Sequence, residues 1–250
     1  MRPLRDAGRG AARHRDGRVR ADDFRGAPPS IRSEDRGEQG PAGGTERTIM
    51  KLTLGAFLTL DGVMQAPGAR DEDLAGGFAH GGWQVPYFDE ELLRIQNERF
   101  AKAEAFLLGR RTYEIFAAYW PKVTGKDNLI ADRLNTLPKY VVSRTLRSAD
   151  WRNSTLLAGD VVQQVTELKR RPGGELQIHG SGRLAQTLAA HGLIDEYRLW
   201  FYPVLLGSGQ RLFDGTTTAA LRLIEAQTTG SGAIAATYRP AGEVRYGSAV

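Results

Sequence analysis

The chain has 250 residues and a net charge of +5, and its hydrophobic fraction of 41% is that of a globular protein. It has no cysteine, which excludes a disulfide framework, a thiolate metal site and a cysteine nucleophile. It has neither a run of about 18 apolar residues nor an apolar signal core, so we expect a cytoplasmic protein with no membrane partner.

The first 49 residues differ in composition from the rest of the chain. They contain 11 Arg and no Lys against 8 acidic residues, and almost no large apolar side chains beyond Leu4, Val19, Phe24 and Ile31. Such a segment cannot bury enough surface to offset chain entropy, so we predict a disordered leader over 1–49. A strand-like run follows Met50 at once, which suggests that Met50 is the physiological start. A basic nucleic-acid tail is the alternative, but the mixed charge weakens it and we expect no nucleic-acid partner.

From Lys51 onward, strand-like and helix-like patterns alternate. Phe88, Leu92 and Ile95 stand at i, i+4 and i+7, which predicts one apolar helix stripe leading towards Ala103. The strands are predicted at 51–59, 105–108, 139–142, 176–178, 196–202, 221–227 and 233–238, and further helices at 111–119, 161–168 and 184–190. This alternation predicts an α/β fold with right-handed crossovers and a mostly parallel sheet covered on both faces. The last two strands predict an antiparallel hairpin at the sheet edge.

Three predicted strand ends carry residues suited to an anion. Ligands of open α/β sheets bind outside the carboxyl ends of the strands. The segments after 105–108, 139–142 and 176–178 offer glycines, hydroxyls and guanidiniums, and two of these segments open a helix. Two cationic ends and one neutral glycine-rich loop favour a dinucleotide with an extra phosphate, NADPH rather than NADH. A Rossmann fingerprint at Gly180, Gly182 and Ala185 is the rival, but the acidic residues Asp195 and Glu196 begin the next strand instead of ending it.

Five short motifs carry a family resemblance. They are Leu60-Asp61-Gly62, Leu108-Gly109-Arg110-Arg111-Thr112-Tyr113-Glu114, Val142-Ser143-Arg144-Thr145, His179-Gly180-Ser181-Gly182-Arg183-Leu184 and Leu205-Leu206-Gly207-Ser208-Gly209. With these motifs, the stretch 50–242 resembles the dihydrofolate reductase-like superfamily. It is most similar to the reductase (C-terminal) domain of the bifunctional riboflavin-biosynthesis deaminase-reductase, RibD, and to its stand-alone relatives. Residues 243–250 are then expected to be a flexible tail.

The resemblance implies a dihydrofolate reductase-like three-layer fold, NADPH as the cofactor and a homodimer. It implies that Gly109 to Thr112 and Ser143 to Thr145 bind the adenosine 2′-phosphate region. It further implies that Gly180, Ser181, Gly182, Arg183 and Leu184 cradle the pyrophosphate. A companion deaminase is not expected, because its zinc site needs cysteines and this chain has none. No other metal site is predicted.

The proton donor and the substrate contacts are predicted from fewer residues. Hydride transfer to a C=N or C=O bond needs a proton, for which Asp61 and Asp89 are the candidates. The alternatives are an ordinary turn at Asp61 and an N-terminal helix acid at Asp89. The substrate is expected beside Gly62, Val63, Trp83, Leu206 and Gly207.

The glycine-rich segment 64–87 contains aromatic side chains and is expected to act as a lid over a flat heterocycle. His80 in this segment is a further possible proton donor. The predicted activity is NADPH-dependent reduction of a pteridine or ribosylaminopyrimidine. A non-catalytic NADP(H)-binding or sensor protein is the alternative.

Overall fold

The structure is a computed structural model, and it describes residues 49–123, 128–215 and 217–248. The leader predicted over residues 1–49 therefore lies almost wholly outside the described residues. Within the described ranges, no helix is long and apolar enough to span a membrane.

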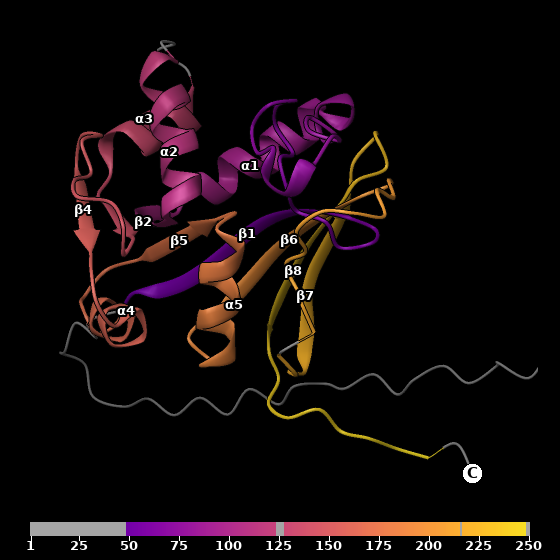
Figure 1. Ribbon diagram of the computed structural model, residues 1–250. Helices are drawn as coiled ribbons and strands as arrows, with labels where there is room; N and C mark the ends of the chain where they lie inside the picture. Colours follow the sequence, from indigo (N-terminus) through magenta and orange to yellow (C-terminus); the bar gives the residue numbers. More distant parts are fainter. Residues whose placement is uncertain (1–48, 124–127, 216, 249–250) are drawn as a thin grey trace, which may run out of the picture. The chain divides into compact units, whose positions relative to one another are not determined.

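An eight-stranded sheet forms the centre of this part of the chain, in the order β4-β3-β2-β5-β1-β6-β8-β7 (Figure 1). Every neighbouring pair from β4 to β6 is parallel, whereas β8 runs antiparallel to β6 and to β7. The predicted mostly parallel sheet with an antiparallel C-terminal hairpin is confirmed. The strands are β1 (Lys51–Thr59), β2 (Ala103–Gly109), β3 (Lys139–Val142), β4 (Ser154–Leu157), β5 (Glu175–His179), β6 (Glu196–Tyr202), β7 (Leu221–Thr228) and β8 (Ile234–Pro240).

Helices cover both faces of the sheet, which gives the three layers that the sequence predicts (Figure 1). Alternate residues of β2 serve the two cores: Leu107 packs with α4 and α5, and Phe106 and Leu108 pack with α1 to α3. Successive strand side chains point to opposite faces, so one buried strand can supply both cores. The helices are α1 (Glu90–Ala101), α2 (Arg110–Tyr119), α3 (Leu129–Thr136), α4 (Val161–Lys169) and α5 (Gly182–Ala190).

The structure departs from the predicted elements at three places. Helix α3 and strand β4 are present but were not predicted. Phe88 is not part of the α1 stripe: the helix begins two residues later, at Glu90, and the Phe88 side chain is exposed, whereas Leu92 and Ile95 are buried. The predicted stripe is therefore wrong at its first position.

Candidate functional site

Three of the predicted segments lie side by side at one edge of the sheet. Strands β3, β2 and β5 are neighbours and parallel, so the segments after Val142, Gly109 and His179 share the same edge. We call these segments, 109–112, 143–145 and 180–184, the cofactor edge. Two of them are joined directly, because the Gly109 amide donates to Ser181 Oγ at 3.0 Å and the Ser181 amide donates to Thr112 Oγ1 at 3.1 Å.

The turn between β5 and α5 has a left-handed backbone at two successive residues. Gly180 has φ 57° and Ser181 has φ 52°. This region is disfavoured for a residue with a side chain, so the turn needs compensating contacts. The Ser181 hydroxyl supplies them, because it donates to the His179 carbonyl at 3.1 Å while accepting from Gly109.

The helix N-termini at this edge differ from the others described. Asp89, Asn128 and Asp160 cap α1, α3 and α4 by accepting from backbone amides of the first turn. Helices α2 and α5 have no side-chain cap hydrogen bond. Their first amides are therefore available to an anion, which the helix dipole also favours.

The arginines of the cofactor edge differ in whether a carboxylate pairs with them. Arg110 lies 3.8 Å from Glu114, a long and exposed pair. Arg111 is bound to Asp73 of the preceding loop, with 2.7 Å from Nη1 to Oδ1. Arg144 and Arg183 are exposed and make no ion pair within the described ranges. The 143–145 turn itself is stabilised by Ser143 Oγ, which accepts from the amides of Thr145 (3.1 Å) and Leu146 (2.9 Å).

Asp61 links two loops instead of holding a proton. Its carboxylate accepts from the Thr59 hydroxyl at 2.6 Å and from the amides of Leu206 (3.2 Å) and Gly207 (2.8 Å). The Thr59 hydrogen bond and then the two amides lower the pKa of Asp61 to about 2, although desolvation opposes them. A group that is ionised at neutral pH cannot act as a general acid there. These contacts favour the turn alternative for Asp61 over the proton donor.

Both carboxylate oxygens of Asp89 also accept hydrogen bonds. One oxygen caps α1 by accepting from the Leu92 amide at 2.8 Å, and the other accepts from the Ser231 amide of the β7–β8 turn at 3.0 Å. The Leu92 hydrogen bond, followed by the contacts with Ser231, lowers the pKa of Asp89 below its usual value despite desolvation. The structure therefore favours the helix-cap alternative for Asp89 over the proton donor.

The long segment 64–87 is folded onto the protein and includes two short 3-10 helices, Ala75–Gly77 and Val85–Tyr87. Gln65 stabilises it: its side-chain Nε2 donates to the Ala75 carbonyl at 3.0 Å, and its own carbonyl accepts from Trp83 Nε1 at 2.8 Å. Phe78 and Trp83 are buried in a cluster with Tyr202. The rings of Phe78 and Trp83 thus pack inward, so neither is exposed to contact a heterocycle under the predicted lid.

The predicted substrate residues occupy different environments. Val63 is fully buried, and Trp83 is only 7% exposed, so neither offers a ring or methyl face to a ligand. Gly62 and Gly207 both have positive φ, which favours glycine. The amides of Leu206 and Gly207 donate to the Asp61 carboxylate. The substrate contacts predicted for Val63 and Trp83 do not fit their burial.

His179 has a structural role in strand β5. His179 stacks on Phe100 with 4.4 Å between ring centroids and shares a hydrogen bond with Gln177. Burial, followed by the nearby charges of Arg198 and Arg99, lowers the pKa of His179 to about 3. It is therefore neutral and structural. His80 lies against Phe78, at 5.6 Å between centroids.

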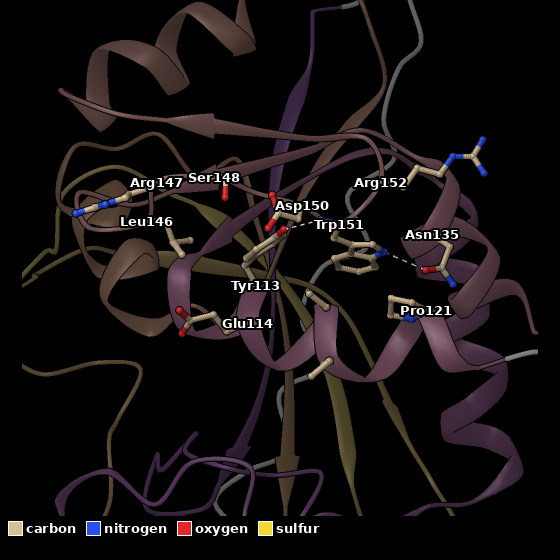
Figure 2. Close-up of a pocket in the computed structure, with 12 residues that line it drawn as sticks. Tyr113, Glu114, Pro121, Asn135, Leu146, Arg147, Ser148, Asp150, Trp151 and Arg152 are labelled. Atoms are coloured by element: carbon tan, nitrogen blue, oxygen red, sulfur yellow. Dashed lines mark hydrogen bonds between the residues drawn. The ribbon is translucent and has the colours of Figure 1, made fainter.

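Beside the 143–145 turn, a pocket of about 830 Å³ opens between α2 with the short 3-10 helix that follows it (Trp120–Lys122), α3 and the β3–β4 connection (Figure 2). Tyr113 and Asn135 hold its wall in place, because they bind the amide and the indole Nε1 of Trp151 at 2.9 Å and 3.1 Å. Arg147 and Arg152 lie at its rim, with Glu114 and Asp150 as opposite charges. The sequence did not predict this pocket, since its residues come from three separated segments.

The family model described as RibD C-terminal domain matches residues 50–235. YyaP of Bacillus subtilis (strain 168), an uncharacterized protein, is 31% identical over 139 residues, which cover 54% of this chain and 73% of YyaP.

Solved structures share the fold at low identity. A putative riboflavin biosynthesis protein from Shewanella sp. PV-4 matches with a TM-score of 0.55 and 18% identity, over 76% of this chain and 99% of that one. A pyrimidine reductase-like protein from Corynebacterium diphtheriae matches with a TM-score of 0.53 and 13% identity, over 79% and 93% of the two chains. The bifunctional deaminase/reductase of Thermotoga maritima matches with a TM-score of 0.53 and 13% identity, over 78% of this chain and 57% of its own.

Proposed function

The chain belongs to the RibD C-terminal domain family, and we propose that it is an NADPH-dependent reductase of a flat nitrogen heterocycle, of the pteridine or ribosylaminopyrimidine kind. The observation that carries the proposal is the cofactor edge. It brings two uncapped helix N-termini, a left-handed glycine-serine turn and several guanidiniums to three adjacent strand ends. The relatives named as reductases support the same class of chemistry.

The residues present fit a phosphorylated dinucleotide. The first amides of α5, after Gly180 and Ser181, suit the pyrophosphate, because aligned N–H groups and the helix dipole both stabilise anions. Arg144, beside the hydroxyls of Ser143 and Thr145, suits the 2′-phosphate that distinguishes NADPH from NADH. The hydrogen bond from the Gly109 amide to Ser181 Oγ keeps these two strand ends close together.

When bound, NADPH supplies a hydride, and the chain must position the substrate and the source of the proton. Asp61 and Asp89 are both ionised and hydrogen-bonded, so we assign them to loop and helix positioning. In this proposal the proton reaches the substrate from water. The Asp61 carboxylate holds the amides of Leu206 and Gly207 beside the first loop, where the resemblance places the substrate.

The decisive test separates NADPH from NADH. A hydrogen bond to a charged group contributes enough that Arg144→Ala should weaken NADPH binding by roughly 10- to 150-fold and leave NADH nearly unchanged. Arg222→Ala on strand β7 is the matched control, because this exposed arginine lies outside the cofactor edge. Calorimetric titration of both cofactors measures the effect, and equal losses for NADPH and NADH would show that Arg144 does not bind the 2′-phosphate.

A second candidate is a non-catalytic NADP(H)-binding or sensor protein. It is favoured by the lowered pKa values of Asp61 and Asp89, because neither of these predicted proton donors then carries a proton at neutral pH. Turnover distinguishes the two. The reductase proposal expects NADPH oxidation with at least one member of a panel of pteridines, aminopyrimidines and flavins, and the sensor expects binding without oxidation.

A further inference from the structure

The loop after β1 touches the cofactor edge at both uncapped helices. At α5, the Met64 thioether packs against Gly182, where an added Cβ would lie only 2.7 Å from the sulfur. At α2, the Asp73 carboxylate holds Arg111, with 2.7 Å and 2.8 Å from Nη1 to its two oxygens. A single segment, residues 64–75, therefore lies against both places where the proposed dinucleotide phosphates bind.

The Asp73 carboxylate is fixed from behind. Its side chain is only 9% exposed, although its partner Arg111 is 51% exposed. The Ala75 amide donates to Asp73 Oδ1 at 3.0 Å, and Gln65 Nε2 donates to the Asp73 carbonyl at 3.2 Å. The loop thus presents an immobilised anion to a guanidinium that begins a helix.

The Asp73 carboxylate is an anion, as is the dinucleotide phosphate expected at Arg111. Arg111 is the second residue of α2, whose N-terminus lacks a side-chain cap. A carboxylate near such an N-terminus gains from the helix dipole as a phosphate does. Two anions held by one guanidinium nitrogen would also repel each other, so carboxylate and phosphate exclude one another at Arg111 Nη1.

We propose that Asp73 is an internal competitor of the dinucleotide phosphate for Arg111, so that cofactor binding releases segment 64–75 from α2. The inference rests on the proposed function for the identity of the ligand. Asp73 thereby sets cofactor affinity without touching the cofactor, and the loop reports whether the cofactor is bound.

The test uses Asp73→Asn in the full chain. The amide oxygen can still accept from the Ala75 amide, so the loop keeps its internal bond while the competing charge is lost. An ion pair of this exposure opposes binding by an amount that corresponds to roughly fivefold in affinity. We expect Asp73→Asn to bind NADPH roughly fivefold more tightly, and Asp71→Asn, an exposed carboxylate of the same loop, to bind it as the native chain does.

Loop release has its own readout. Arg70 is the only lysine or arginine between Lys51 and Arg94, so trypsin cleavage after Arg70 monitors this loop alone. Saturating NADPH should speed this cleavage in the native chain, and Asp73→Asn should be cleaved fast without any ligand. Asp71→Asn should behave as the native chain in both conditions.

The outcomes separate the inference from the proposed function. Unchanged or weaker NADPH binding by Asp73→Asn, or protection of Arg70 by NADPH, overturns the competition while leaving the reductase proposal intact. If neither the native chain nor Asp73→Asn binds NADPH, both ideas fail. Tight binding by Asp73→Asn with none by the native chain supports the competition in its strongest form.

Discussion

Lys139 is a fully buried charge that serves the fold. Its Nζ donates to the carbonyls of Leu134 (2.8 Å) and Leu137 (2.9 Å) at the end of α3, and it lies 4.5 Å from the ring centre of Trp151. These contacts satisfy the last carbonyls of the helix, which otherwise lack partners. Burial, helped by the charge of Arg152, lowers the pKa of Lys139 to about 8.

This pKa predicts a stability change at alkaline pH. The ordinary pKa is 10.5, so between about pH 8 and 10.5 the unfolded chain keeps the Lys139 proton that the folded chain has lost. Stability rises with pH wherever the unfolded state binds more protons. The Lys139 contribution to the free energy of unfolding should therefore rise through this window.

Urea unfolding of the native chain and of Lys139→Met at several pH values between 7 and 11 measures the contribution. The difference between the two should shift in favour of the native chain as pH rises. Lys102→Met, at an exposed position after α1, is the control and should show no such shift. A pH-independent difference for Lys139→Met would contradict the assigned pKa.

Among the elements, the N-terminal cap of α1 makes two kinds of contact. Asp89 caps the helix and also binds the β7–β8 turn through the Ser231 amide, whereas Asp160 only caps α4, accepting from Val162 and Gln163. Losing a cap costs about 1 kcal/mol, and losing a second hydrogen bond to a carboxylate adds to it.

We therefore expect Asp89→Ala to lower the free energy of unfolding by about 2 to 3 kcal/mol, against about 1 kcal/mol for Asp160→Ala. Hydrogen exchange should also quicken at the amides of the β7–β8 turn in Asp89→Ala alone. Equal losses in the two variants, with no change at the turn, would mean that the Ser231 contact contributes nothing.

Elements with a clear period were predictable from the sequence, and the others were not. Strands β1 and β6 match their predicted ranges because most of their residues are apolar or aromatic. Helix α3 and strand β4 have only eight and four residues, and neither leads into one of the five family motifs, as the equally short strand β3 does. Within the site, the motifs located the three strand ends. The Asp73–Arg111 ion pair and the hydrogen bonds from Leu206 and Gly207 to Asp61 join residues far apart in the chain, and no local sequence pattern predicts them.

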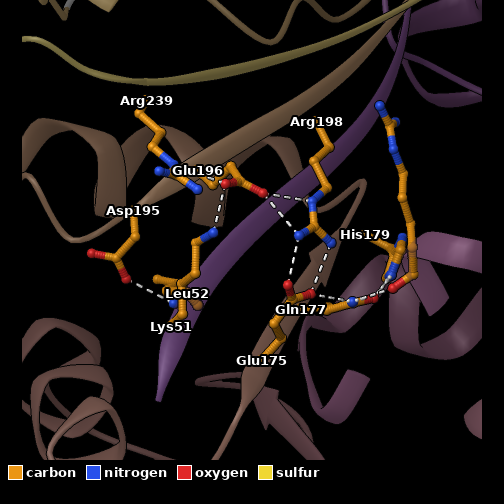
Figure 3. Close-up of polar contacts among 10 residues, drawn as sticks. Lys51, Leu52, Glu175, Gln177, His179, Asp195, Glu196, Arg198 and Arg239 are labelled. Carbon is orange, nitrogen blue, oxygen red and sulfur yellow. Dashed lines mark hydrogen bonds and ion pairs between the residues drawn. The ribbon is translucent and has the colours of Figure 1, made fainter. Parts of the chain in front are cut away.

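At the scale of the whole described domain, a charged network crosses the sheet near the start of its central strands (Figure 3). Arg198 of β6 reaches Glu175 of β5 at 2.6 Å and Glu196 at 2.8 Å. Glu196 is also bound by Lys51 at 2.5 Å and by Arg239 at 3.0 Å. Although burial opposes it, the Lys51 hydrogen bond and the Arg198 charge lower the pKa of Glu196 to about 2.

Removing the buried cation should matter far more than removing the exposed one. Arg198→Met leaves Glu175 and part of Glu196 buried without their partner, and breaking a buried pair in this way costs about 3 to 5 kcal/mol. Arg239 is 48% exposed, so Arg239→Met should cost less than about 1 kcal/mol although it touches the same glutamate. Urea unfolding at neutral pH compares them, and similar losses would show that burial does not govern this network.

The strand order also bears on how the chain acquires this structure during synthesis. Strand β1 leaves the ribosome first among the strands, but its two neighbours, β5 and β6, are made after β2, β3 and β4. Until His179 has been made, β1 has no partner and β2 lacks one of its two, so the central sheet waits for late contacts between distant segments. Such contacts fold slowly. The β2–β3–β4 portion can assemble early with its helices, and the insertion of β5 then joins β1 to it and brings the two uncapped helices together in a single late step.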